Sequence, residues 1–217
     1  MIRAVIYDMD GTLVDSEGAI AQAAKEALVD WGITCQLPDF LTFTGRGDDR
    51  FIGGVAEKYG VVYTPAMKQR AYEIYMATAR ERVTVYPWSK PLIDFFAGRG
   101  MKSAVASASD RVKVLYNIDA IGVSADRFDA VITASEVTRQ KPDPEIFNKA
   151  RKALGTRAEE TLVFEDSLMG VKAAKAARMY CIAVTTSYDT PALYEAGADA
   201  VLPDPAVLCG LSRIFNT

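Results

Sequence analysis

The stretch that decides the fold lies near the start of the chain and reads Val5-Ile6-Tyr7-Asp8-Met9-Asp10-Gly11-Thr12. Its apolar part is continuous rather than alternating, which is typical of a strand buried on both faces of a parallel sheet. Two carboxylates follow, one residue apart, and then a glycine that permits the chain to turn out of the sheet. Because residues i and i+2 of an extended chain project to the same side, Asp8 and Asp10 are predicted to face one ligand.

Short apolar runs of the same kind recur along the rest of the chain. The predicted strands are Ala4–Tyr7, Ser103–Ala106, Ala130–Thr133, Thr161–Phe164, Cys181–Val184 and Ala200–Leu202. The predicted helices between them are Asp110–Ile121, Pro144–Leu154 and Leu168–Ala177. Such an alternation of strands and helices implies a parallel sheet with right-handed crossovers. The predicted fold class is therefore α/β, with a doubly wound, Rossmann-like parallel sheet.

The segment between the first two predicted strands, about 95 residues, is too long for a single crossover. Its first part, residues 16–82, has the pattern of helices only. We therefore expect an all-helical cap domain at 16–82, inserted after the first strand into an α/β core made of residues 1–15 and 83–217. A domain this small is only marginally stable by itself, so we expect it to pack against the core. We also expect it to move relative to the core about hinges near Val14–Glu17 and Arg82–Pro87.

The composition excludes several classes of function. The 217 residues carry 25 basic and 28 acidic side chains, a near-balance that gives no support for nucleic-acid or membrane-surface binding. No apolar run approaches the roughly 20 residues of a membrane span. Three scattered cysteines favour a reducing compartment, so we expect a cytoplasmic protein. The oligomeric state is left open between a monomer and a small homo-oligomer. The chain has no histidine, which excludes Ser-His-Asp triads and histidine bases.

Polar side chains also follow the later predicted strands. Ser107 and Ser109 come after the second strand, Lys141 stands beyond the third, and Glu165-Asp166-Ser167 ends the fourth. Ligands of a doubly wound sheet bind beyond the carboxyl ends of its strands, so these residues are predicted to meet there. We interpret Ser109 as a helix cap.

Four carboxylates at one edge of a sheet would repel one another unless a cation joined them. Oxygen ligands without histidine or cysteine favour Mg²⁺, which commonly shares phosphate oxygens with the protein. Ser107 can donate a hydrogen bond to a phosphate, and Lys141 can offset its charge. Of two neighbouring aspartates, one can attack phosphorus while the other protonates the leaving oxygen and later activates water.

Taken together, these motifs resemble those of a known enzyme superfamily. The segment from Asp8 to Ser16 resembles the first motif of the haloacid dehalogenase (HAD) superfamily. The other motifs match in order, as Ser107, as Lys141 within Lys-Pro-Asp-Pro-Glu-Ile-Phe, and as Glu165-Asp166-Ser167. The helical insert resembles the cap of the β-phosphoglucomutase-like subgroup. The resemblance covers essentially the whole chain.

The resemblance implies a role for each motif residue. Asp8 would be the nucleophile and Asp10 the general acid/base. Mg²⁺ would be held by Asp8, the backbone carbonyl of Asp10, and Asp166 with help from Glu165.

The resemblance also places the substrate. Ser107, its neighbour Ala108 and Lys141 would bind the transferring phosphoryl group. The cap loop Thr44-Gly45-Arg46-Gly47-Asp48 matches the place where this subgroup contacts its substrate, and Arg46 suits a second anionic group or sugar hydroxyls.

These implications favour a Mg²⁺-dependent phosphatase that hydrolyses a small phosphorylated metabolite, a sugar phosphate or similar, through an aspartyl-phosphate intermediate. The alternative is a sugar phosphomutase of the β-phosphoglucomutase type. Mutases of the subgroup typically use a histidine shortly after the first motif, where this chain has Asp15-Ser16-Glu17-Gly18. A dehalogenase would not need Asp10, a phosphonatase would need a distinctive cap lysine, and a non-catalytic relative would be expected to lack a motif residue.

Overall fold

A parallel sheet forms the centre of the computed structural model, which describes residues 1–43 and 47–210. Within these residues the sheet has six strands: β1 (Ala4–Tyr7), β4 (Lys102–Ala106), β5 (Ala130–Ile132), β6 (Thr161–Glu165), β7 (Tyr180–Val184) and β8 (Ala200–Leu202). Their order is β5-β4-β1-β6-β7-β8, and every neighbouring pair is parallel. The predicted doubly wound α/β fold is confirmed.

Strand β1 lies at the centre of this sheet. It pairs with β4 and β6 on its two sides, so Ala4 lies opposite both Lys102 and Thr161. Its side chains alternate between two cores, with Ile6 in one and Tyr7 in the other. Burial on both faces is the reason for its continuous apolar sequence.

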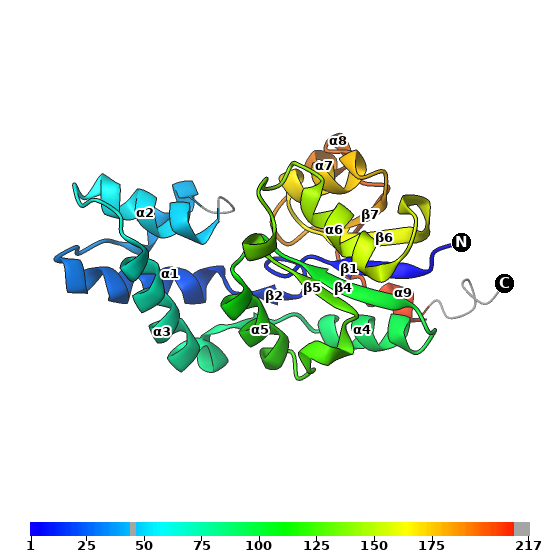
Figure 1. Ribbon diagram of the computed structural model, residues 1–217, viewed down its shortest axis with the longest axis horizontal. Coiled ribbons are helices and arrows are strands. Elements are labelled where there is room, and N and C mark those ends of the chain that lie inside the picture. Colours follow the sequence, from blue (N-terminus) through cyan, green and yellow to red (C-terminus); the bar gives the residue numbers. More distant parts are fainter. Residues whose placement is uncertain (44–46, 211–217) are drawn as a thin grey trace.

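Helices cover both faces of the sheet (Figure 1). On one face lie α6 (Glu145–Leu154), α7 (Leu168–Ala176) and α8 (Thr190–Glu195). On the other lie α4 (Ser89–Ala97), α5 (Arg111–Ala120) and α9 (Val207–Gly210). Helix α4 lies in a part of the chain, between residues 83 and 102, to which the sequence analysis assigned no element. Short 3₁₀ helices span Ala125–Arg127, Ala134–Glu136 and Ala158–Glu160.

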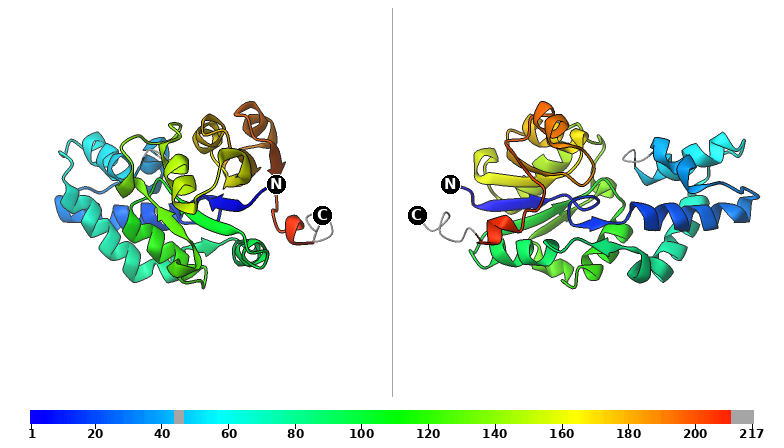
Figure 2. Two further views of the ribbon diagram at one scale, coloured as in Figure 1. Left: turned by 45° about the vertical axis from the view of Figure 1, so that its right-hand side comes forward. Right: turned by 180° about the vertical axis from the view of Figure 1, so that it is seen from behind.

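The segment between β1 and β4 contains a helical insert, which we define as residues 17–82 (Figure 2). Its elements are α1 (Glu17–Leu28), α2 (Asp48–Lys58), α3 (Pro65–Arg82) and the 3₁₀ helices Val29–Trp31 and Leu37–Phe43. They share a hydrophobic cluster of their own, in which α1 packs mainly against α3. The predicted domain boundaries at 15/16 and 82/83 stay a prediction.

The two chain segments that enter and leave the insert lie side by side. Strand β2 (Val14–Asp15) pairs antiparallel with β3 (Thr84–Val85). Just beyond them, the indole Nε1 of Trp88 donates a hydrogen bond to the carbonyl of Thr12 at 3.0 Å. Each predicted hinge segment therefore contains one strand of this two-stranded pair. The motion of the hinges stays a prediction.

Among the described residues, no helix has both the length and the apolar character that crossing a bilayer requires.

Candidate active site

Three buried carboxylates meet at the carboxyl ends of β1 and β6. Asp8 follows β1, Glu165 ends β6, and Asp166 follows it. Each offers one oxygen, and these oxygens lie within 4.8 Å of one another. Because parallel strands end at the same edge of a sheet, neighbouring β1 and β6 deliver these side chains to one place. The predicted gathering of the motif residues is found for these three.

Lys141 lies against the same cluster. Its Nζ donates hydrogen bonds to Asp8 Oδ1 at 2.6 Å and to Glu165 Oε1 at 2.5 Å, and its side chain is only 8% exposed. The ammonium also lies 4.9 Å from the centre of the Phe147 ring. One buried cation thus faces three buried carboxylates.

Glu165 and Asp166 are each held by fixed donors. Glu165 Oε2 accepts hydrogen bonds from the backbone amides of Asp166 and Ser167, both at 2.7 Å, and from Ser167 Oγ at 3.0 Å. Asp166 accepts one from Thr12 Oγ1 at 3.2 Å and another from Ser187 Oγ. Ser187 lies beyond β7, and the sequence analysis did not find it. These donors orient the carboxylates toward one another.

The pKa shifts in the cluster indicate that the single positive charge of Lys141 does not balance the three carboxylates. Burial raises the pKa of Asp8 to about 8, because the opposing charge of Lys141 is partly cancelled by Glu165. Burial also raises the pKa of Asp166, and the charges of Glu165 and Asp8 add to the shift. A donor set of oxygens alone fits a hard divalent cation, which would reverse both shifts.

Asp10 has a different set of partners, although it lies next to the cluster. Its Oδ2 accepts hydrogen bonds from Ser109 Oγ at 2.7 Å and from Ser107 Oγ at 3.4 Å, and its Oδ1 accepts one from Ser16 Oγ. Burial favours the neutral acid, but the charge of Lys113 and hydrogen bonds from Ser16 and Ser109 outweigh it and lower the pKa of Asp10. Asp10 is therefore a carboxylate in this arrangement, the form that can accept a proton.

Three residues of helix α5 and its start contact Asp10, and the sequence analysis did not expect them to do so. Ser109, interpreted there as a helix cap, instead directs its hydroxyl at Asp10. Lys113 Nζ lies 3.1 Å from Asp10 Oδ1, and Asn117 Nδ2 lies 3.3 Å from the same oxygen. The available signal was their spacing of four residues, which puts Lys113 and Asn117 on the inward face of α5 with Ser109 just before that helix.

The predicted phosphate-binding residues lie at the same edge of the sheet. Ser107 is buried just after β4, and its Oγ accepts a hydrogen bond from the amide of Ser109 at 3.1 Å. Ala108 lies between them and is half-buried. Arg46 lies outside the described residues, so its predicted role is untested.

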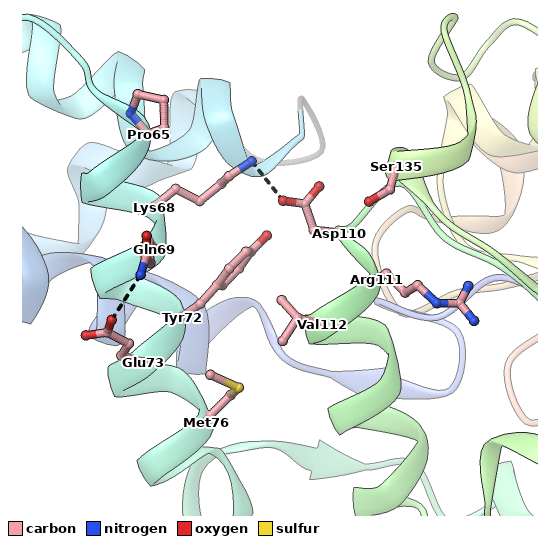
Figure 3. Close-up of a pocket in the computed structure, with 10 residues that line it drawn as sticks. All are labelled: Pro65, Lys68, Gln69, Tyr72, Glu73, Met76, Asp110, Arg111, Val112 and Ser135. Atoms are coloured by element: carbon pink, nitrogen blue, oxygen red, sulfur yellow. Dashed lines mark hydrogen bonds and ion pairs between the residues drawn. The ribbon is translucent and has the colours of Figure 1, made fainter.

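A pocket of about 480 Å³ separates α3 from the start of α5 (Figure 3). At its rim, Lys68 Nζ bridges Asp49 and Asp110 at 2.7 and 2.8 Å. Tyr72 points into the gap between the two helices, and its hydroxyl donates a hydrogen bond to Asp48 at 2.6 Å. With only 18% of its side chain exposed, Lys68 links the insert to the core. The three clustered carboxylates do not line this pocket.

Comparisons with known proteins agree with this architecture. A family model described as haloacid dehalogenase-like hydrolase matches residues 5–184. The phosphorylated carbohydrates phosphatase of Thermotoga maritima is 29% identical over 99% of this chain and 100% of its own length. A β-phosphoglucomutase of Clostridium difficile has the same fold, with a TM-score of 0.77 and 22% identity over 93% of this chain and 91% of that one.

A plant protein is also similar. The protein SUPPRESSOR OF QUENCHING 1, chloroplastic, of Arabidopsis thaliana is 39% identical over 207 residues. The match covers 94% of this chain but 20% of the Arabidopsis protein, so the chain spans about a fifth of that relative's length.

Proposed function

We propose that this chain, which belongs to the haloacid dehalogenase-like hydrolases, is a phosphatase that hydrolyses a small phosphorylated metabolite through an aspartyl-phosphate intermediate. The observation that carries the proposal is the buried cluster of Asp8, Glu165 and Asp166 with Lys141 against it. The predicted membership in the superfamily is confirmed, and the phosphatase among the relatives supports this reaction class.

Asp8 is the proposed nucleophile. Lys141 holds its Oδ1, which fixes the carboxylate at the end of β1. A carboxylate oxygen of Asp8 bonds to phosphorus while the bond from phosphorus to the leaving oxygen breaks. The leaving oxygen takes a proton from Asp10, and water then attacks the aspartyl phosphate, giving its proton back to Asp10. Inorganic phosphate and free Asp8 result.

The second half of this reaction suits the state of Asp10 in the structure. Because its pKa is lowered, Asp10 is ionised and can accept the proton of the attacking water. In the first half Asp10 must carry a proton, which it takes up from solvent before the leaving oxygen departs.

We assign Asp8, Asp166 and the backbone carbonyl of Asp10, with help from Glu165, as the residues that would hold Mg²⁺. When bound, the ion supplies positive charge to offset the phosphoryl oxygens and the clustered carboxylates. The all-oxygen donor set and the raised pKa values of Asp8 and Asp166 support this assignment.

The proposed substrate is a sugar phosphate or similar metabolite, as the name of the Thermotoga relative suggests. Ser107, Ala108 and Lys141 would bind its phosphoryl group, and Arg46 would contact the rest of it. The helical insert would act as a cap over the site, with the domain boundaries predicted from the sequence.

We also propose that the protein is a cytoplasmic monomer or small homo-oligomer without nucleic-acid or membrane partners. Three free cysteines among the described residues, two of them buried, support a reducing compartment.

The experiment that tests the function measures phosphate release with Mg²⁺ across sugar phosphates, nucleotides, phosphoglycolate and pyrophosphate. Asp8→Asn and EDTA serve as controls. Release that disappears in both controls would support the aspartyl-phosphate phosphatase and begin to identify its substrate. If folded protein released phosphate from none of these compounds, the proposal would fail.

The phosphomutase is the second candidate, because the fold is also that of a β-phosphoglucomutase. A hexose bisphosphate added with a hexose phosphate would then yield an isomerised sugar phosphate. The chain lacks the histidine that this subgroup's mutases typically use, so we expect hydrolysis instead.

A further inference from the structure

The carboxylate of Asp10 is surrounded by more donors than it has free lone pairs. A carboxylate offers about four lone-pair sites on its two oxygens. The side chains that contact it are Ser16, Ser107, Ser109, Lys113 and Asn117. The proposed reaction uses Asp10 itself, and it assigns no role to Lys113 or Asn117.

Lys113 is the only one of these donors that carries a charge. Its side chain is 4% exposed, and its Nζ lies 3.1 Å from both Asp10 Oδ1 and Ser109 Oγ. Burying an ammonium is costly unless it is paired and hydrogen-bonded. Lys113 is therefore tied to Asp10 and to the serine that holds the other oxygen of Asp10, which fixes the carboxylate from two directions.

Asn117 connects Asp10 to the helical insert. The hydroxyl of Tyr75, on α3, donates a hydrogen bond to Asn117 Oδ1 at 2.6 Å, and both side chains are buried. Because Tyr75 occupies the amide oxygen, the amide nitrogen of Asn117 must face Asp10, where it donates at 3.3 Å. The tyrosine of the insert thus sets the orientation of a core residue that contacts the proposed acid/base.

We propose that Lys113 and Asn117 are positioning residues for Asp10, and that Tyr75 of the insert positions Asn117 in turn. The proposal rests on the proposed function, because it concerns the aspartate that exchanges a proton with the leaving oxygen. Neither Lys113 nor Asn117 needs to touch the substrate. Their part is to hold the carboxylate where the leaving oxygen will be, since misplacement by about 1 Å can cost roughly 10²-fold in rate.

The chemistry of the leaving group separates positioning from a merely structural role. A sugar alkoxide leaves only when it receives a proton, whereas p-nitrophenolate is stable without one. Loss of a well-placed Asp10 should therefore slow the first half of the reaction, transfer of the phosphoryl group to Asp8, much more for a sugar phosphate than for p-nitrophenyl phosphate, whereas the later attack of water on the aspartyl phosphate is common to both. A loosened fold would slow both alike.

The first variant is Lys113→Met, which removes the charge and keeps the length of the side chain. We expect the first-turnover rate of phosphoryl transfer from the best sugar phosphate of the panel to fall about 10²-fold, with little change in KM. For p-nitrophenyl phosphate we expect the first-turnover burst of p-nitrophenolate to slow by less than about threefold, because transfer of its phosphoryl group to Asp8 needs no proton from Asp10. In an Asp10→Asn background, Lys113→Met should lower the rate with the sugar phosphate little further, since the effects of substituting residues that act as a unit are not additive.

A second series keeps the test sharp if Lys113→Met does not fold. Tyr75→Phe removes one hydroxyl and frees the amide of Asn117, so we expect about a fivefold loss in the first-turnover rate for the sugar phosphate alone. Tyr63→Phe is the matched control, because it removes a hydroxyl that hydrogen-bonds to Asp49 instead. Circular dichroism and thermal melts check that each variant folds.

Equal losses on the two substrates, no loss on either, or a full further loss in the Asp10→Asn background would overturn the proposal. These outcomes differ from a failure of the proposed function, in which wild-type protein releases no phosphate or Asp8→Asn remains active. The leaving-group comparison is made only on a wild-type activity that requires Asp8.

Discussion

Replacing Gly170 by alanine tests whether the carboxylate cluster is packed as tightly as the structure indicates. Gly170 lies in the first turn of α7, and a Cβ built there would meet Glu165 Oε1 at 1.7 Å and its Cδ at 1.9 Å. Glu165 would have to move. It would then lose its 2.5 Å contact with Lys141 and its hydrogen bonds from two backbone amides.

Two opposing effects set the size of the change. Alanine in place of glycine stabilises a helix by about 1 kcal/mol. Breaking a buried ion pair such as Lys141–Glu165 costs about 3–5 kcal/mol, because a charge is left uncompensated. We therefore expect Gly170→Ala to lower the free energy of unfolding by about 2–4 kcal/mol. For a protein of this size the melting temperature would fall by about 4–16 °C.

Urea denaturation and thermal melts at neutral pH measure this effect, with Gly18→Ala in α1 as the matched control. A Cβ at Gly18 meets no atom within 4 Å, so that variant should be as stable as wild type or up to about 1 kcal/mol more stable. If Gly170→Ala were as stable as Gly18→Ala, the close contact with Glu165 would be refuted.

Two further predictions concern pH and metal. Hydrogen bonds from Lys149 and from the Thr138 amide lower the pKa of Glu145 to about 2. The ionised Glu145 side chain therefore contributes its full share of stability above the usual glutamate pKa, and this share is lost as the pH falls toward 2. Glu145→Gln should therefore melt below wild type at pH 7, with a difference that narrows toward pH 3; a constant difference would contradict this. Mg²⁺ at about 100 times its Kd should add roughly 2.7 kcal/mol of stability to wild type. The gain should be absent in Asp166→Asn, and an equal rise in melting temperature for both proteins would count against the assigned metal ligands.

The strands could be predicted closely because burial on both faces leaves a local signal. The strand predicted at Ser103–Ala106 is observed at Lys102–Ala106, and Ala4–Tyr7 is observed unchanged. Helix α4 was not assigned, although its apolar residues Leu92, Ile93 and Phe96 pack under the sheet. The order of the strands was not predicted either, because an apolar run shows that a strand is buried but not which strand lies beside it.

The candidate site was predictable where a functional residue is the last of a strand or directly follows one. Asp8, Glu165 and Asp166 are of this kind, and Lys141 was found within its motif. Ser187 was missed because its contact with Asp166 joins loops that follow two different strands. No local periodicity marks such a contact.

The sequence by itself determined which strands are buried and which carboxylates stand at their ends, because both depend on the order of residues within a few positions. Only the tertiary structure decided what surrounds each carboxylate. Asp10 and Lys113 are separated by 103 positions, yet their oxygen and nitrogen lie 3.1 Å apart. That contact exists because β4 pairs beside β1, so the helix that follows β4 turns its polar face toward the end of β1. Strand order and helix orientation arise from packing across the whole molecule, and they set the charge that each carboxylate meets.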